Sequence, residues 1–323
     1  MNSTGPYTQT KDGQVISLNA PAYSIEDVEK AAASTADGIG LLSTDFMYLG
    51  RNDLPGEEEQ LEILLHISSL MDNRPVTVRT LQAPSSTIPA LSRAGLSDNC
   101  RGVRLGLAQP GIMQTQLRAI VRAAASGNFR LLLPMIADVS EIIKVKEIIN
   151  TIHHELNKQN THVSSLLDLG IELEVPGAVV MAPVLSFEVS FFSISEKLQH
   201  HSLAIDGRYE NNELLHEYAP SFLFQISGLA EEAHKRRKSV AVTAPLAGRL
   251  PAIPLLVAMG VNELVMSPEH MEQARDIISR LTITKAKLVT SKAMSFWSPD
   301  EIQHYAEESL SRLAPGAAQR AGC

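Results

Sequence analysis

RLLLPMI, residues 130–136, is an almost continuous apolar run. A run of this kind is typical of a parallel strand that is covered on both faces. Comparable runs occur along the chain at 15–19, 38–42, 76–80, 170–175, 189–194, 239–244 and 262–267. Longer amphipathic stretches separate them, at 24–35, 56–72, 113–126, 138–158, 219–237 and 271–283. Eight such repeats predict an α/β fold, a closed (β/α)8 TIM barrel with right-handed crossovers.

Two further segments affect the domain boundaries. GVRLGL, residues 102–107, has the composition of an extra strand, but we assign it to a helix or loop after the third strand. Residues 298–311 start with Ser298 and Pro299, which is typical of a helix start, and predict a final helix. Because no linker-like segment divides the chain, we expect one barrel domain over residues 1–312 and a flexible tail over 313–323.

Composition excludes several classes of function. The net charge is −8 and no long basic block is present, which argues against nucleic acid as a partner. No apolar run approaches the roughly 18 residues that span a bilayer, and the polar N-terminus has no secretion signal. The two cysteines, Cys100 and Cys323, form no disulfide framework or metal motif. We therefore expect a cytoplasmic protein without membrane contact.

The barrel prediction also indicates where a site would lie. Active sites of this fold are built at the C-terminal ends of the strands. Those ends carry Ser43 with Thr44, Arg79, Glu174, the loop 195–208 and the segment 243–249.

Six blocks of sequence follow one another in a familiar order. The first reads DGIGLLSTDFMYLGRNDLPGEEEQ (37–60), and the later ones are PVTVRTL (75–81), LRAIVRAAASGNFRLLLPMI (117–136), GIELEVPGAV (170–179), FFSI with SLAID (191–194, 202–206) and LAG with MGVNELVMS (246–248, 259–267). Together they resemble the phosphoenolpyruvate-binding C-terminal domain of Enzyme I of the bacterial sugar phosphotransferase system. The resemblance runs from about residue 8 to about residue 310.

The resemblance implies a phosphoenolpyruvate/pyruvate-type TIM barrel that binds phosphoenolpyruvate and Mg²⁺. In this family a histidine on a separate N-terminal phospho-carrier domain receives the phosphoryl group, and that domain is not found in these 323 residues. The family dimerises through the barrel, so we expect a homodimer, with phosphotransferase-system proteins as further candidate partners.

Three positions agree with the family pattern. Arg79 and Arg101 match phosphate-binding arginines, and Glu174 in GIELEVP matches the first of two metal-binding carboxylates. Such residues suit phosphoenolpyruvate, because guanidinium forks bind phosphate and carboxylates hold Mg²⁺. A surface ion pair is the alternative role for either arginine.

Other positions depart from the pattern. Ser43 stands where the family has an arginine, and QAPSSTIP (82–89) replaces a loop with a lysine and two aspartates. Glu196 and Lys197 replace an Asn-Asp pair whose aspartate is the second metal ligand. Only Glu174 is thus left as a metal ligand.

The departures continue beside the seventh strand. Thr243 takes the position of the catalytic cysteine, Pro245 that of a glutamate and Arg249 that of an aspartate. A hydroxyl is far less acidic than a thiol, so Thr243 is a poor proton donor. Arg249 and Arg208 add positive charge and extend the candidate ligand-binding set of Arg79, Arg101, Glu174 and Lys197.

These departures favour one functional hypothesis over two others. An ammonium at a metal-ligand position repels a divalent cation, so we expect Lys197 to pair with Glu174 and Mg²⁺ binding to be weak or absent. The leading hypothesis is a non-catalytic anion-binding or regulatory module for a ligand such as phosphoenolpyruvate or pyruvate. The alternatives are a phosphotransferase component acting in trans, or a drifted activity on a pyruvate-like acid, and a structural partner of a genuine Enzyme I.

Overall fold

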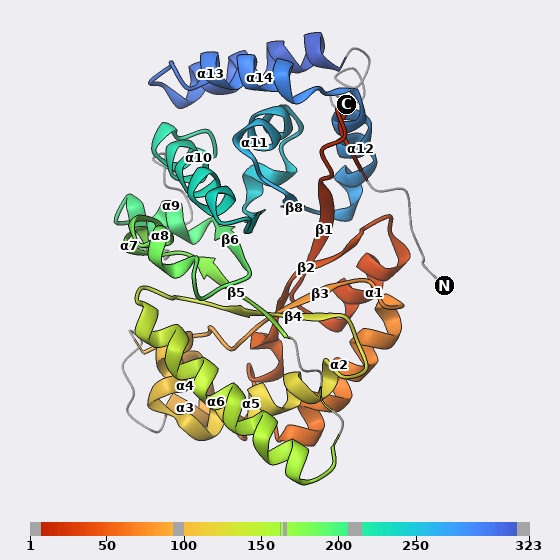
Figure 1. Ribbon diagram of the computed structural model, residues 1–323, viewed down its shortest axis with the longest axis vertical. Coiled ribbons are helices and arrows are strands. Elements are labelled where there is room, and N and C mark those ends of the chain that lie inside the picture. Colours follow the sequence, from red (N-terminus) through yellow and green to blue (C-terminus); the bar gives the residue numbers. More distant parts are fainter. Residues whose placement is uncertain (1–7, 93–99, 162, 164–166, 206–214, 315–323) are drawn as a thin grey trace.

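Parallel strands in sequence order form the centre of the molecule (Figure 1). The computed structural model describes residues 8–92, 100–161, 163, 167–205 and 215–314. Within these ranges eight strands pair with their neighbours in the chain, and the last closes on the first. The predicted (β/α)8 barrel is therefore confirmed.

Each strand overlaps the run from which it was predicted. The strands are β1 (Ser17–Ala22), β2 (Gly38–Ser43), β3 (Val76–Arg79), β4 (Phe129–Leu133), β5 (Asp168–Leu173), β6 (Phe191–Ser195), β7 (Ser239–Thr243) and β8 (Glu263–Val265). The first strand lies later than the predicted 15–19, because Val15 instead forms an isolated antiparallel bridge with Gln9. The fourth ends earlier than predicted, at Leu133, because the next residue, Pro134, has no N–H to donate to a neighbouring strand.

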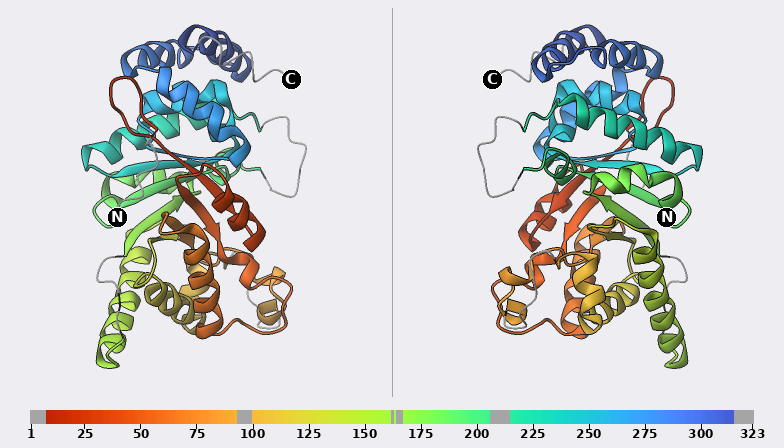
Figure 2. Two further views of the ribbon diagram at one scale, coloured as in Figure 1. Left: turned by 90° about the vertical axis from the view of Figure 1, so that its right-hand side faces the viewer. Right: turned by 90° about the vertical axis from the view of Figure 1, so that its left-hand side faces the viewer.

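Helices connect the strands and cover the outside of the barrel (Figures 1 and 2). Those expected from the sequence are α1 (Ile25–Ala33), α2 (Glu57–Met71), α5 (Pro110–Ala123), α6 (Val139–Lys158), α10 (Pro220–Lys235), α12 (Met271–Arg280) and α14 (Pro299–Leu313). The others are α3 (Pro89–Ser92), α4 (Val103–Ala108), α7 (Pro176–Val180), α8 (Ala182–Leu185), α9 (Lys197–Ser202), α11 (Ile253–Met259) and α13 (Ile283–Ala293). The segment 102–107 is helical, as we expected, and α13 and α14 pack outside α11.

Local chemistry accounts for where the helices begin. Asp138 caps α6 by accepting a hydrogen bond from the N–H of Ser140, and the Glu141 carboxylate accepts one from the N–H of Asp138. This is a reciprocal capping box. Ser24 caps α1 in a similar way, on the N–H of Asp27. None of the helices in the described part of the chain is both long and apolar enough to cross a bilayer.

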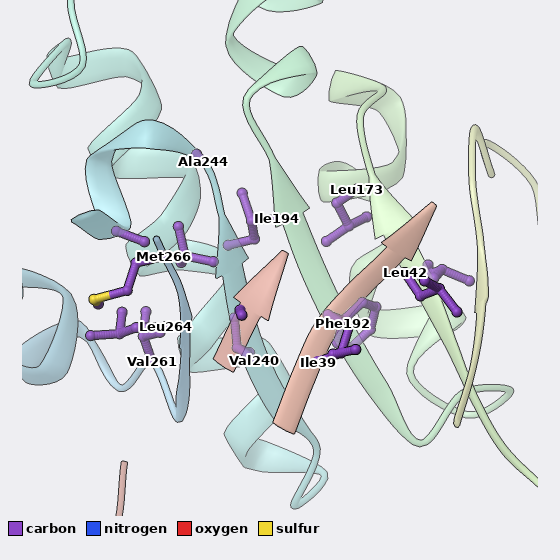
Figure 3. Close-up of a cluster of buried hydrophobic side chains, with 14 of the residues drawn as sticks. Ile39, Leu42, Leu173, Phe192, Ile194, Val240, Ala244, Val261, Leu264 and Met266 are labelled. Carbon is purple, nitrogen blue, oxygen red and sulfur yellow. The ribbon is translucent and has the colours of Figure 1, made fainter. Parts of the chain in front are cut away.

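The core joins the strands to the surrounding helices. Figure 3 shows part of the buried hydrophobic cluster, with side chains from β2, β6, β7 and β8, among them Ile39, Phe192, Ile194, Val240 and Leu264. Each of these is fully removed from solvent. Burying a side chain of this size contributes about 1.5–3 kcal/mol, so this cluster is the main source of stability for the closed sheet.

A charged pair closes the N-terminal end of the barrel. Arg130 at the start of β4 reaches across to Glu263 at the start of β8, with Nη2 and Oε1 2.9 Å apart. The same guanidinium donates to the Thr77 hydroxyl and lies 4.7 Å from the ring centroid of Phe191. Because this end is filled, the open end lies at the C-terminal ends of the strands.

Gly40 in β2 lies where the barrel interior has no room for a side chain. A Cβ built there would lie 2.4 Å from Val265 Cγ2 and 3.0 Å from both Asn19 Cβ and Glu263 Oε1. Gly228, on the exposed face of α10, has nothing within 4 Å of such a Cβ. The two glycines therefore form a matched pair for testing the packing.

We expect the Gly40→Ala substitution to lower the free energy of unfolding by about 1–3 kcal/mol, because the methyl group overpacks the barrel interior. Gly228→Ala should raise it by about 0.5–1 kcal/mol, because alanine favours a helix interior. Urea unfolding followed by circular dichroism measures both. Equal effects of the two substitutions would contradict the described packing inside the barrel.

Candidate functional site

A cavity of about 560 Å³ opens at the C-terminal mouth of the barrel. Residues at or near the ends of several strands line it: Ser43, Arg79, Glu172, Ser195, Thr243 and Val265. Phe46, Leu49 and Met266 add an apolar wall. The cavity therefore lies where this fold normally has its active site, and both polar and apolar side chains line it.

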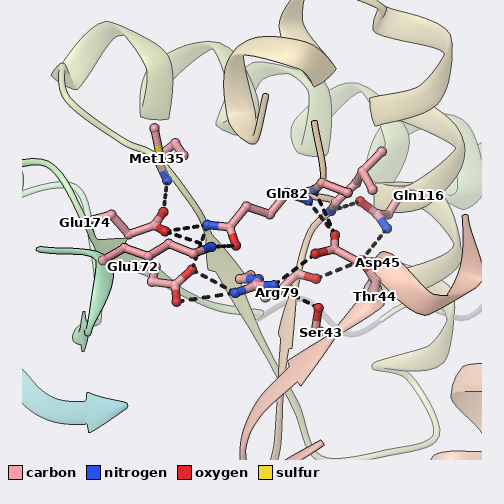
Figure 4. Close-up of polar contacts among 12 residues, drawn as sticks. Ser43, Thr44, Asp45, Arg79, Gln82, Gln116, Met135, Glu172 and Glu174 are labelled. Carbon is pink, nitrogen blue, oxygen red and sulfur yellow. Dashed lines mark hydrogen bonds and ion pairs between the residues drawn. The ribbon is translucent and has the colours of Figure 1, made fainter. Parts of the chain in front are cut away.

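Arg79 is the central cation of this cavity (Figure 4). It is only 5% exposed, at the end of β3. Its Nη1 lies 3.3 and 3.4 Å from the two carboxylate oxygens of Glu172, and its Nη2 donates to Ser43 Oγ at 2.8 Å and to Asp45 Oδ2 at 3.2 Å. Among the described residues no acceptor faces its buried Nε–H. The predicted ligand-binding arginine is thus largely engaged by the protein's own side chains.

Glu172 is the counter-ion of Arg79, and the sequence reasoning missed it. Its side chain is only 1% exposed, inside β5. Burial and the neighbouring Glu174 raise the pKa of Glu172 to about 7, although the Arg79 guanidinium opposes the shift. The carboxyl group thus titrates near neutral pH.

Glu174 lies beside it, fully buried just after β5. Its Oε2 accepts from the N–H of Met135 at 2.7 Å, and its Oε1 accepts from the side-chain amide of Gln82. The Nζ of Lys197 lies 3.4 Å from the same Oε1 and donates to the side-chain oxygen of Gln82. The predicted ion pair between Lys197 and Glu174 is therefore present, and both oxygens of the carboxylate are engaged.

An unusual backbone conformation supports this arrangement. Met135 follows β4 with a φ of 59°, in the left-handed region that non-glycine residues rarely occupy. That conformation belongs to the residue whose N–H meets Glu174. Gly102 packs against it, because a Cβ at Gly102 would lie 2.9 Å from Met135 Cβ. This left-handed backbone conformation therefore places the N–H of Met135 where it donates to the buried Glu174 carboxylate.

Arg101 lies in an adjoining cavity rather than beside Arg79. That cavity, of about 300 Å³, shares Asp45, Gln82 and Lys197 with the first. The Nη2 of Arg101 lies 3.4 Å from Nε2 of His201, whose Nδ1 is 2.7 Å from the carbonyl oxygen of Glu174. Because arginine can only donate, His201 accepts at Nε2 and donates from Nδ1. The two predicted arginines therefore face different parts of the mouth.

Two of the remaining candidate residues, Thr243 and Arg249, line the first cavity. The hydroxyl of Thr243 lies 2.9 Å from that of Ser193. The side chain of Arg249 is 59% exposed and paired with Glu217, with Nη2 and Oε1 2.8 Å apart. Arg208 lies outside the described residues, as does most of the predicted tail 313–323. The geometry thus brings Thr243 and Arg249 to the mouth.

Comparison with known proteins settles the family. Residues 3–283 match the family model described as "PEP-utilising enzyme, PEP-binding domain". The chain belongs to this family. The phosphoenolpyruvate-protein phosphotransferases of Listeria monocytogenes and Geobacillus stearothermophilus are 32% and 33% identical to it over 307 and 312 residues. The matches cover 93% and 94% of this chain and 54% of each relative, so this PEP-binding domain spans about half the length of those relatives.

A solved structure supports the fold independently. A citrate lyase from Burkholderia xenovorans superposes with a TM-score of 0.56 at 15% identity, over 96% of this chain and 97% of the other. At this identity the likeness extends to the barrel architecture alone.

The Mg²⁺ that the family implies does not fit the residues at the mouth of this barrel. Glu174, the expected first ligand, already accepts three hydrogen bonds or ion pairs, one of them from the ammonium of Lys197. In the described ranges no three His, Cys, Asp or Glu residues are grouped so as to hold a metal ion. Because the Lys197 ammonium lies against this carboxylate and would repel a divalent ion that needs its oxygens, we assign no metal role to Glu174.

Three residues that the sequence reasoning missed complete the site: Asp45, Gln82 and Glu172. Asp45 accepts from Arg79 and from the N–H of Gln82 at 2.7 Å, so it joins the ends of β2 and β3. Glu172 had a usable signal, because residues two apart on a strand lie on the same face. Its spacing from Glu174 therefore predicts that both carboxylates lie on one side of the strand. The role of Gln82 depends on a loop that no pattern identifies.

The raised pKa of Glu172 predicts a pH-dependent stability. Between pH 4.5, the ordinary value of a glutamate, and about 7, the folded protein keeps a proton that the unfolded chain has lost. Relative to a Glu172→Gln variant, the wild-type free energy of unfolding should therefore fall as pH rises through this window, by on the order of 3 kcal/mol. Urea unfolding of both proteins from pH 4.5 to 8 measures the difference. A pH-independent difference would show that Glu172 ionises normally.

Proposed function

We propose that this barrel binds a small acid at its mouth without Mg²⁺ and transfers no phosphoryl group from phosphoenolpyruvate, and so acts as a binding or regulatory module. The observation that carries the proposal is the 3.4 Å contact between Lys197 Nζ and Glu174 Oε1. The ammonium supplies the positive charge that a divalent cation would otherwise supply beside this carboxylate.

Electrostatics decide between the two cations. At about 4 Å and an effective dielectric constant near 20, a unit charge and a divalent ion repel each other by roughly 8 kcal/mol. Mg²⁺ would bind only after Lys197 had moved away, which would leave Gln82 without its contact to the ammonium. The ion pair already neutralises Glu174, so an approaching metal gains little.

The thiol that the family pattern places at the end of β7 is also absent, and Glu172, which lines the same cavity, is held in an ion pair with Arg79. Protonation of an enolate carbon requires an acid whose pKa lies near neutral pH. Thr243, at the expected position, is a hydroxyl paired with Ser193 Oγ. Phosphoryl transfer depends on cations that stabilise developing charge, yet Arg79 is paired with Glu172 and Asp45. These features support binding rather than turnover.

Arg79 and Lys197 remain the groups that would attract a ligand. The side chain of Lys197 is 37% exposed, and Arg79 is a buried cation whose Nε–H has no acceptor among the described residues. Both line the larger cavity, next to an apolar wall. This combination suits a compact acid with a small apolar body, such as pyruvate.

A second candidate function is favoured by the comparisons. The relatives from Listeria monocytogenes and Geobacillus stearothermophilus are named phosphoenolpyruvate-protein phosphotransferases, and they match over almost the whole of this chain. On that basis the barrel would work in trans with a separate phospho-carrier domain. Pyruvate release from phosphoenolpyruvate in the presence of such a domain would support this function and contradict our proposal.

The role of Lys197 can be tested by exchanging its charge. We expect the melting temperature of the wild-type protein to be unaffected by Mg²⁺ or by a chelator, because the ammonium excludes the ion. A Lys197→Asp variant should gain a Mg²⁺-dependent rise in melting temperature, since a new carboxylate would replace the ammonium beside Glu174. Thermal shift assays with and without Mg²⁺ measure both.

The matched control is Lys285→Asp on the exposed side of α13, which changes the net charge equally and lies away from the mouth. It should respond to Mg²⁺ as the wild type does. A Mg²⁺-dependent stabilisation of the wild type itself would overturn the metal-free site.

A further inference from the structure

We propose that Glu172 sets the charge of the ligand, so that the mouth accepts singly charged acids such as pyruvate and rejects phosphate esters such as phosphoenolpyruvate. Glu172 would then be a specificity-determining residue that acts by competing with the ligand for Arg79. The inference rests on the proposed function, because it assumes that a small acid binds in this cavity.

The competition follows from how the guanidinium is shared. Nη1 of Arg79 faces both oxygens of Glu172, and Nη2 is divided between Ser43 and Asp45. The remaining donor, Nε, is itself buried, so an incoming anion finds both terminal nitrogens of Arg79 already engaged. A phosphate group needs several donors at once, whereas a carboxylate can be held with fewer. To bind phosphate fully, the arginine would have to leave Glu172 behind as an unpaired buried charge.

Glu172 cannot avoid that conflict by turning into solvent. Its side chain is 1% exposed. Besides Arg79, its carboxylate contacts the side-chain amide of Gln82, with Nε2 and Oε2 3.4 Å apart. Removing one partner of a buried pair typically costs several kcal/mol, because the other charge is left without compensation. The carboxylate therefore stays in place and repels any further negative charge that enters.

The overall charge of the cluster points the same way. The described residues that contact one another here comprise two cations, Arg79 and Lys197, and three carboxylates, Asp45, Glu172 and Glu174. With Glu172 ionised the cluster is already negative before a ligand arrives. Phosphoenolpyruvate adds about three negative charges and pyruvate adds one. In a partly buried site the cluster therefore repels phosphoenolpyruvate much more strongly than pyruvate.

The lining of the cavity fits the smaller charge as well. Beside the polar groups lie Leu41, Phe46, Val265 and Met266. An apolar wall of this kind favours the methyl or alkyl end of a 2-oxo monocarboxylate and offers no hydrogen bond to a second anionic group. Charge and shape therefore select the same class of ligand.

Isothermal titration calorimetry without Mg²⁺, at about pH 8 and thus above the pKa of Glu172, tests the inference directly. The probes are pyruvate, phosphoenolpyruvate and inorganic phosphate. We expect the wild type to bind pyruvate at least tenfold more tightly than phosphoenolpyruvate. A Glu172→Gln variant should bind phosphoenolpyruvate at least tenfold more tightly than the wild type does. The control Glu301→Gln, which removes an exposed carboxylate on α14, should keep the wild-type preference.

The outcomes separate the inference from the function on which it rests. Pyruvate binding by the wild type, with no gain of phosphoenolpyruvate binding in a correctly folded Glu172→Gln variant, overturns the inference and leaves the proposed function standing. Absence of binding of every probe to the wild type overturns both. If the variant does not fold, the wild-type order of affinities decides, and phosphoenolpyruvate binding as tight as pyruvate binding overturns the inference.

Discussion

The contact between the Lys197 ammonium and the Glu174 carboxylate holds the mouth of this barrel together. A fully buried carboxylate is costly unless its charge is compensated, and here an ammonium, a side-chain amide and a backbone N–H share that task. The amide belongs to Gln82, which also contacts Glu172, the counter-ion of Arg79. One continuous set of polar contacts therefore runs from the start of α9 across the mouth to the end of β3.

A mouth organised in this way differs from a site built to stabilise the transfer of a phosphoryl group. A phosphoryl-transfer catalyst holds cations ready for charge that develops in the transition state. In this protein the principal cations already face carboxylates of the same chain, so a ligand has to replace an internal partner before it gains an ion pair. This arrangement is compatible with reversible binding. It would also explain how a member of the PEP-binding family keeps the barrel fold without phosphoryl transfer.

The sequence predicted the barrel well because the signals for it are local and repeated. Each apolar run marks a strand, and caps such as Asp138 mark the starts of helices. The ends of the strands then placed Arg79, Glu174, Lys197 and Thr243 at one mouth without any knowledge of side-chain positions. The pairing of Lys197 with Glu174 also followed, since it needed only two opposite charges at neighbouring strand ends.

What the sequence did not predict depends on the paths of loops and on three-dimensional neighbours. Arg101 faces a separate cavity, which Met135 also lines, and the next residue, Gly102, packs against Met135. Arg249 was expected to add free positive charge, yet Glu217, from a different loop, pairs with it. Gln82 lies in a segment without secondary-structure periodicity, and only the fold shows that its amide joins two buried glutamates.

The central claim is that an ammonium, rather than a metal ion, compensates Glu174, and crystals grown with Mn²⁺ and pyruvate test it most directly. Manganese takes the same oxygen ligands as magnesium and is located by its anomalous scattering. The account predicts no anomalous peak at Glu174 and an Nζ of Lys197 that stays within ion-pair distance of its Oε1. A manganese ion on Glu174, with Lys197 turned into solvent, would contradict it.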